Sequence, residues 1–199
     1  LELPVTTADI CPFTDVEDNL DPSDELYPDH YVAMCASRGI TLGKTPTTFA
    51  PYDSLSRQQL ITMVVRAACL PDPVSSLPLF GSAQFWPREH YFNARMAYEA
   101  GMLDDLCTVQ PAWASFDFFK DATRGEVCAL LYNLLRSPAV VEGRAMMAAV
   151  EASLGADSVL VTATSPRFSG PWAGLFVAPA VDSGARFPVL LKLENGSWG

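Results

Sequence analysis

The chain has 199 residues, of which 49% are hydrophobic and 18% charged, a composition typical of a globular protein with a buried core. Its formal net charge of −10 argues against a nucleic-acid-binding protein, because such proteins need a basic face to neutralise phosphates. No apolar run approaches the roughly 20 residues that a membrane-spanning helix needs, so we expect no membrane span.

A segment of the chain recurs 67 positions further along. The residues at 56–67, Ser-Arg-Gln-Gln-Leu-Ile-Thr-Met-Val-Val-Arg-Ala, return at 123–134 as Thr-Arg-Gly-Glu-Val-Cys-Ala-Leu-Leu-Tyr-Asn-Leu. Shorter matches surround this one in the same order: Phe13 with Phe80, Asp29-His30-Tyr31 with Glu89-His90-Tyr91, Arg38-Gly39-Ile40 with Ala100-Gly101-Met102, and Phe49 with Phe116. The pattern indicates two copies of one structural unit.

Each copy is predicted to begin with a helix and to continue through an irregular loop into a second helix. The first helix starts near His30 or His90 and ends at Gly39 or Gly101, because a glycine commonly ends a helix. The second helix starts at a capping box, in which two side chains satisfy the free N–H groups of the first turn. The capping residues are Ser56 with Gln59, and Thr123 with Glu126.

Apolar residues follow both capping boxes with the 3.6-residue spacing of a helix that buries one face. They are Leu60, Ile61, Val64, Val65 and Ala68 in the first copy, and Val127, Leu130, Leu131, Leu134 and Leu135 in the second. Neither pair of helices could bury its apolar faces alone. We therefore expect the two copies to pack on each other.

The repeat pattern stops at Pro138, and the rest of the chain has a different character. Residues 140–154 are predicted to form an amphipathic helix that ends at Gly155. Three β-rich runs follow, separated by turn signals, and Asn195-Gly196 predicts a tight hairpin before a strand at Ser197-Trp198. The β-rich runs are 158–164, 175–180 and 187–193.

The predicted fold class is therefore mainly α with a C-terminal α+β part. Two packed helix-loop-helix repeats occupy residues 8–70 and 71–137, and a small helix plus antiparallel sheet occupies 138–199.

The motifs of the first copy resemble the S-layer homology (SLH) repeat. They are Phe-Thr-Asp-Val at 13–16, His-Tyr at 30–31, Gly-Ile-x-x-Gly at 39–43, Phe-x-Pro at 49–51 and Ser-Arg-Gln-Gln at 56–59. The second copy is degenerate: it keeps His90-Tyr91, Gly101 and the capping box, but reads Phe-Gly-Ser-Ala at 80–83. The family usually carries three repeats, and two are visible here.

The resemblance implies an exported, extracellular bacterial protein attached non-covalently to the cell wall. Its partner would be an anionic, often pyruvylated, cell-wall polysaccharide bound in grooves between repeats. The family's arginine carries over to Arg57 and Arg124. Independently, an arginine beside the unsatisfied N–H groups of a helix start completes a pocket for a carboxylate or phosphate. Further candidate ligand-binding residues are Gln58, Gly39, Gly43 and Tyr31.

Each of these residues also has a purely structural interpretation. The arginines could pair with a neighbour such as Asp53 or Asp121, the glycines could serve turn geometry, Gln58 could be a polar surface residue, and Tyr31 could belong to the core. A degenerate SLH pair could accordingly act as a structural or protein-interaction module that binds no glycan.

Other polar groups do not indicate catalysis. His30 and His90 occupy equivalent places in the two copies, as structural helix-start residues would. The eight acidic residues between Asp9 and Asp29 lack the spacing of a calcium loop and indicate a solvated segment. No nucleophile elbow, zinc helix or phosphate loop is present, so we expect neither an enzyme nor a cofactor. Among five scattered cysteines, Cys107 and Cys128 are the pair we would test for a disulfide, if the protein is exported.

Overall fold

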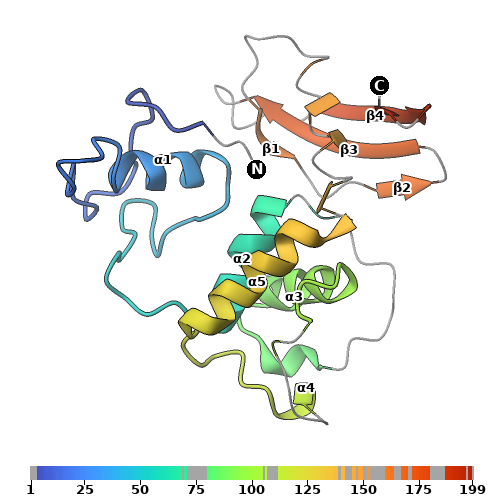
Figure 1. The fold of residues 1–199 in the computed structure, drawn as a ribbon, viewed down its shortest axis with the longest axis horizontal. Helices are drawn as coiled ribbons and strands as arrows, with labels where there is room; N and C mark the ends of the chain where they lie inside the picture. Colours follow the sequence, from blue (N-terminus) through green and yellow to red (C-terminus); the bar gives the residue numbers. More distant parts are fainter. Residues whose placement is uncertain are drawn as a thin grey trace. The chain divides into compact units, whose positions relative to one another are not determined.

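The computed structural model divides the chain into two compact units, residues 1–53 and 54–199 (Figure 1). The division lies inside the first predicted repeat, because the second helix of that repeat packs with helices of the second repeat. The residues that the structure describes are 4–68, 70, 80–104, 106, 112–138, 140–141, 145–146, 148–149, 152, 160–163, 167–169, 172–179, 187–195 and 197–198.

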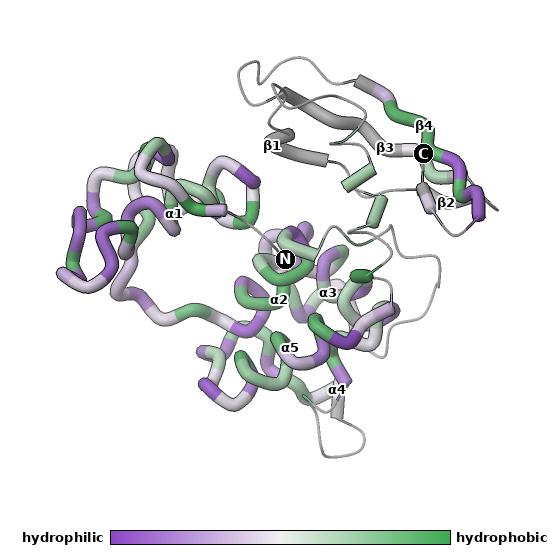
Figure 2. The backbone as a smooth tube through the Cα atoms, turned by 45° about the horizontal axis from the view of Figure 1, so that its top comes forward, coloured by the Kyte–Doolittle hydropathy of each residue, from purple (hydrophilic) through white to green (hydrophobic). Residues whose placement is uncertain are grey.

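The first unit is built around one helix, α1 (Asp29–Ser37), and the loops before and after it. Many positions of these loops are hydrophilic and are drawn purple in Figure 2. The carboxylate of Asp15 ties the two loops together, since it accepts the amides of Phe49 at 2.8 Å and Ala50 at 2.7 Å. Phe13, which is buried, packs against the Phe49 ring with 5.4 Å between ring centroids.

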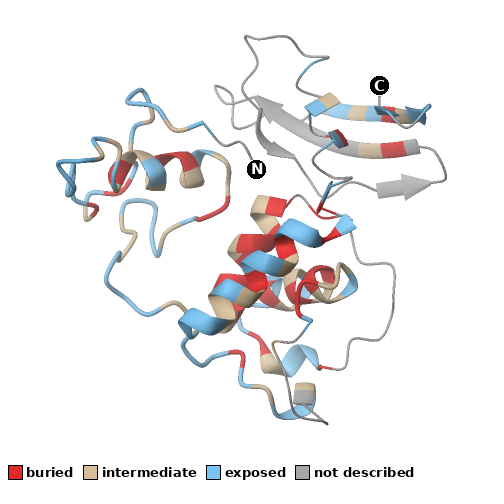
Figure 3. Cartoon of the chain, in the orientation of Figure 1, coloured by how far each residue is buried: buried red, intermediate tan, exposed pale blue. Residues whose placement is uncertain are grey.

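The second unit contains four described α-helices and a short 3₁₀ turn, η1 (Ser82–Gln84). Helix α2 (Arg57–Ala68) packs on α3 (Glu89–Glu99) and on α5 (Arg124–Arg136), and α4 (Ala112–Ser115) is a single turn. Figure 3 shows buried residues concentrated along α2 and on one side of α5. The prediction that the copies pack on each other is confirmed for the helices of this unit.

An aromatic cluster anchors the loop between α3 and α5. The rings of Phe85 and Phe118 lie 4.2 Å apart, and Phe80 contacts both. Trp113 stacks on Phe118 with an angle of 11° between the rings. Phe118 is 1% exposed. The segment 116–122 is therefore held against the helices. Its position determines which of its backbone groups lie beside the start of α2.

The C-terminal residues form an antiparallel sheet, as predicted. Strand β3 (Trp172–Pro179) pairs with β1 (Leu160–Ala163), with β2 (Arg167–Ser169) and with β4 (Phe187–Glu194), and β4 pairs with β5 (Ser197–Trp198). The predicted hairpin is confirmed: Glu194 pairs with Ser197, and Asn195 has the positive φ of 52° that such a turn requires. The described residues between 138 and 152 are helical, as expected for 140–154.

The helix ends of the two copies match in detail. Gly39 and Gly101 have φ of 66° and 69°, and each follows its helix in the left-handed conformation. In both copies the following residue donates its amide to the carbonyl five residues back: Ile40 to Cys35 at 2.9 Å and Met102 to Ala97 at 2.8 Å. A hydrogen bond of this kind, next to a left-handed glycine at the helix end, is typical of the Schellman motif. The prediction of glycine-ended helices is confirmed.

Two expectations for the apolar stripe of α5 were wrong. Leu131 is 44% exposed and Leu135 is 70% exposed, although their spacing fits a buried face. Leu130 and Leu134 of the same predicted stripe, at 0% and 5%, are buried as expected. The apolar arc of α5 is wider than the side that packs within its unit. Strand β2 was not expected either.

Candidate functional site

The start of α5 carries the exposed arginine of the candidate site. Thr123 caps the helix: its hydroxyl accepts the amide of Glu126 at 3.2 Å, and the Glu126 carboxylate accepts the amide of Thr123 at 2.8 Å. The predicted capping box is thus confirmed. Arg124, the first residue of the helix, is exposed, and its side chain has no hydrogen bond or ion pair with the described residues.

The space around the same turn is open. Among the described residues, the amides of Arg124 and Gly125 have no acceptor, and a Cβ atom built on Gly125 would meet only the Thr123 hydroxyl, 3.9 Å away. Within the described part of the chain, the first turn of α5 therefore presents a guanidinium and amides that have no acceptor, the set of donors from which an anionic group accepts hydrogen bonds.

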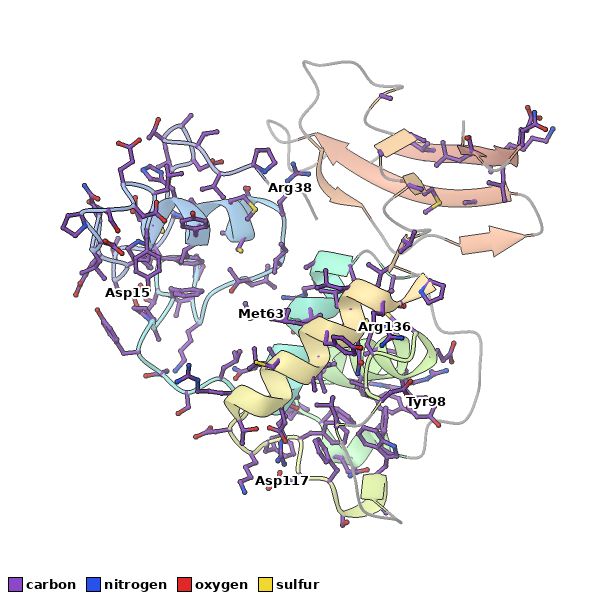
Figure 4. The ribbon with its side chains drawn as sticks, in the orientation of Figure 1. Asp15, Arg38, Met63, Tyr98, Asp117 and Arg136 are labelled. Carbon is purple, nitrogen blue, oxygen red and sulfur yellow. The ribbon has the colours of Figure 1, made fainter. Side chains whose placement is uncertain are left out.

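Arg57, the equivalent residue of α2, is held inside the protein. Its Nη2 atom lies 2.6 Å from Oε1 of Glu126, and its Nη1 atom donates to the carbonyl of Asp117 at 3.0 Å. The guanidinium also stacks 4.4 Å above the centre of the Phe116 ring. Asp117 lies in the loop that precedes α5 (Figure 4). The partner is Glu126, neither of the aspartates that the sequence suggested.

The N–H groups at the start of α2 are also occupied. The amide of Arg57 donates to the carbonyl of Lys120 at 2.9 Å, and that of Gln58 donates to the carbonyl of Phe118 at 3.0 Å. The loop that the aromatic cluster holds in place thus runs beside the start of α2. Ser56 and Asp121 form an isolated antiparallel β-bridge there. The two helix starts are alike in sequence but differ in their hydrogen-bond donors. At the start of α2 the arginine and the backbone amides are engaged, and we call this start closed. At the start of α5 they have no acceptor among the described residues, and we call this start open.

Burial and hydrogen bonding act in opposite directions on Glu126. Burial by itself would raise the pKa of this carboxyl, but the hydrogen bonds from Arg57 and Thr123 outweigh it and hold the pKa below its ordinary value. Glu126 is therefore ionised at neutral pH. It balances the Arg57 guanidinium, and both side chains are largely buried, at 15% and 16% exposure.

Gln58 connects α2 to the segment before α3. Its amide nitrogen donates to the carbonyl of Trp86 at 2.8 Å, and its amide oxygen accepts the Trp86 amide at 3.2 Å. Gln58 is 6% exposed. Both polar ends of this side chain are thus used within the protein.

The remaining candidate residues belong to the first unit. Gly43 has φ of 68°, and a Cβ atom there would lie 2.4 Å from Cε1 of Phe13, so the loop requires glycine. Gly39 ends α1, as described above. Tyr31 is 40% exposed and donates its hydroxyl to Asp24 at 3.2 Å, a bond that raises the pKa of the phenol.

The histidines lie at equivalent positions, each the second residue of its helix. His30 contacts the carbonyl of Asp9 through Nδ1 at 2.6 Å, and His90 contacts the Thr62 hydroxyl through Nδ1 at 2.6 Å. Thr62 also accepts a hydrogen bond from Asn93 at 3.3 Å. Burial lowers the pKa of His90. Each bond connects a histidine to another segment of the chain, in agreement with the structural role predicted for both histidines.

The acidic segment is organised by hydrogen bonds within the first unit. Asp15 accepts the two loop amides described above, and the hydroxyl and amide of Ser23 both donate to Asp21. Each set of bonds lowers the pKa of its carboxyl, with the Phe49 amide the main cause for Asp15. No group of three or more potential metal ligands occurs among the described residues.

The structure thus brings Arg57 to the first turn of α5, whose first residue is Arg124, while Tyr31, Gly39 and Gly43 belong to the other unit. Sequence reasoning did not identify Glu126 as the partner of Arg57. The available signal was a charge difference: the second capping box carries an acid where the first carries neutral Gln59. Cys128 is an exposed free thiol, and Cys107, its predicted partner, lies outside the described residues.

Within the described part of the chain, none of the helices has the length and apolar character needed to cross a membrane. Comparison of the chain with protein-family models, with curated proteins and with solved structures finds no match.

Proposed function

We propose that this is an exported bacterial cell-envelope protein whose SLH-like repeats attach it non-covalently to an anionic cell-wall polysaccharide. The proposal rests on the motifs of the two copies and on one observation of the structure, the open start of α5. There the exposed Arg124 guanidinium adjoins the free amides of Arg124 and Gly125. A carboxylate of the glycan would accept hydrogen bonds from both kinds of donor.

The net charge of −10 means that attraction to an anionic polymer must come from this local geometry and not from the field of the whole protein. Binding should therefore depend strongly on Arg124. Arg57 is a poor choice for testing the proposal, because it is paired with Glu126 and its removal would disturb the fold.

Co-sedimentation with purified cell-wall sacculi, with and without their secondary polymer, tests the proposal. We expect wild type to sediment only with polymer-bearing walls and Arg124→Ala to lose most of this binding. Arg136→Ala is the matched control, because it removes an exposed arginine from the last turn of the same helix. Equal binding by wild type and Arg124→Ala would contradict the assigned site.

A second function, a structural or protein-interaction module that binds no glycan, is favoured by the closed start of α2. There the arginine, the amides and the glutamine are all engaged within the protein. This alternative predicts that wild type does not sediment with the producing organism's own wall.

A further inference from the structure

Two loops beside the start of α2 carry matching pairs of aromatic residues. Phe85 and Trp86 precede α3, and Phe118 and Phe119 precede α5. The first member of each pair is buried, whereas the second is exposed: Trp86 is 74% exposed and Phe119 is 51% exposed. Each loop thus places one ring in the core of the helices and turns the next ring to solvent.

The contacts of the two loops bring the exposed residues to neighbouring places. The buried rings of Phe85 and Phe118 lie 4.2 Å apart. Gln58 holds both loops, because its side chain bonds both peptide groups of Trp86 and its amide donates to the Phe118 carbonyl at 3.0 Å. Phe85 has an extended backbone, with φ of −136° and ψ of 143°, so the next side chain points the opposite way. Trp86 and Phe119 therefore extend to solvent from adjacent backbone segments.

A cation accompanies each exposed ring. Arg88 follows Trp86 by two positions, and Lys120 follows Phe119 directly. Both cations are exposed, and neither forms an ion pair with a residue that the structure describes. The guanidinium of Arg88 lies 5.5 Å from the centre of the Phe92 ring. We call Trp86, Phe119, Arg88 and Lys120 the aromatic-cation surface.

The open start of α5 adjoins this surface. The carbonyl of Lys120 accepts the amide of Arg57 at 2.9 Å, and the guanidinium of Arg57 pairs with Glu126 in the first turn of α5. Arg124 begins that turn. The aromatic-cation surface and the exposed arginine of the proposed glycan site thus meet at the closed start of α2.

Aromatic rings with cations beside them match the chemistry of an acidic saccharide. A sugar ring has an apolar face of C–H groups, which stacks on an exposed aromatic ring, and its hydroxyl and carboxylate oxygens accept hydrogen bonds from neighbouring cations. We propose that Trp86 and Phe119 bind sugar rings of the polysaccharide whose carboxylate the start of α5 accepts, with Arg88 and Lys120 as donors to its oxygens. This inference rests on the proposed function and extends its site beyond the anionic group.

The first copy has an equally exposed aromatic pair and provides a matched control. The offset of 67 aligns Tyr52 with Phe119, and Tyr27, like Trp86, stands directly before the proline that leads into the first helix of its copy. Tyr52 and Tyr27 are 77% and 49% exposed. Asp53, which is already in an ion pair, stands where the second copy has its lysine. We therefore assign no acidic saccharide to this pair.

Co-sedimentation with polymer-bearing sacculi over a range of protein concentrations is the first test. We expect Trp86→Ala/Phe119→Ala to raise the apparent dissociation constant more than about tenfold, because two exposed aromatic contacts are lost. Tyr27→Ala/Tyr52→Ala should leave the constant unchanged. An equal loss in both double variants overturns the inference.

The single variant Arg124→Ala separates this inference from the proposed function. Wild-type affinity in Trp86→Ala/Phe119→Ala, with binding lost in Arg124→Ala, overturns the aromatic-cation surface and leaves the proposed function standing. Binding lost in the aromatic variant but kept in Arg124→Ala supports the surface and contradicts the anion site. If wild type does not sediment, the proposed function fails and this inference fails with it.

The second test uses tryptophan fluorescence of the full chain and keeps an aromatic ring at every position. Acrylamide quenching is measured with and without polymer released from the sacculi, and Trp86→Phe isolates the contribution of Trp86 among the four tryptophans. We expect the polymer to protect Trp86 from acrylamide, so that protection is seen in wild type and is lost in Trp86→Phe. Equal protection in both proteins overturns the inference. A Trp86 that acrylamide does not reach before polymer is added also overturns it, since the chain itself would then cover the ring.

Discussion

The Nη2 atom of Arg57 lies 2.6 Å from Oε1 of Glu126, so the arginine of one capping box is paired with the acid of the other. The pair joins the first turns of α2 and α5. It engages the guanidinium of Arg57, whereas the guanidinium of Arg124, at the same position of the second copy, is exposed. One duplicated motif has therefore become a structural ion pair at one place and an exposed cation at the other.

Glu126→Gln is expected to destabilise the protein, because it leaves the largely buried Arg57 guanidinium without its counter-charge. We expect a loss of about 2–3 kcal/mol in the free energy of unfolding. Urea unfolding followed by circular dichroism measures it. Glu89→Gln is the matched control: Glu89 is 51% exposed and pairs with Arg66 at 3.4 Å, so its loss should cost less than about 1 kcal/mol. Equal effects would show that burial of the Arg57 pair has no energetic weight.

The pH dependence of stability should report the same pair. The pKa of Glu126 is lower in the folded protein than its ordinary value of 4.5, so the unfolded chain binds more protons in the interval between the two values. The stabilisation is present above pH 4.5 and is lost as the pH falls through the folded pKa. We expect urea midpoints measured from pH 7 downward to fall less steeply in this range for Glu126→Gln than for wild type. Identical slopes would contradict the assignment.

His90 should contribute to the pH dependence of stability at higher pH than Glu126 does. Burial lowers its pKa from the ordinary value of 6.5, so the folded protein keeps the imidazole neutral while the unfolded chain takes up a proton. Stability from this group is complete above pH 6.5 and declines as the pH falls toward the folded pKa. NMR titration should place the His90 midpoint below 6.5. In His90→Gln the decline of stability just below pH 6.5 should be smaller, whereas His30→Gln should retain it.

The two loop glycines allow a test of backbone requirements. Gly43 and Gly101 have nearly equal positive φ, of 68° and 69°, but a Cβ atom at Gly43 would lie 2.7 Å from the Thr48 carbonyl and closer still to Phe13. At Gly101 the nearest atom is a carboxylate oxygen of Asp104, 3.2 Å away, which can move. We expect Gly101→Ala to cost about 1–2 kcal/mol from the left-handed backbone alone, and Gly43→Ala to cost more. Thermal unfolding of the two variants provides the comparison, and an equal loss would contradict it.

The Asp15 carboxylate offers a test confined to the first unit. Asp15→Ala leaves the amides of Phe49 and Ala50 without their acceptor, and we expect faster cleavage of the 41–53 loop under limited proteolysis. The control is Asp21→Ala, which removes a local turn contact to Ser23 and should leave cleavage of that loop unchanged.

Much of the helical part could be predicted from the sequence because its signals are local. The capping boxes at Ser56 and Thr123 and the glycines at 39 and 101 act within a few residues of the chain, so the helix starts and ends that they predict are those observed. The Asn195 turn is local in the same way. The S-layer homology of the repeats and the glycan remain predictions.

Tertiary structure decided which of the two equivalent arginines stays available. Arg57 and Arg124 have the same place in their repeats, but among the described residues only Arg57 meets an acid, an aromatic ring and a loop carbonyl, and these come from residues 59 or more positions away. Packing likewise decided that Val64 is buried and Leu131 exposed. Sequence periodicity determines which face of a helix is apolar, whereas the presence of a neighbouring helix determines whether that face leaves water.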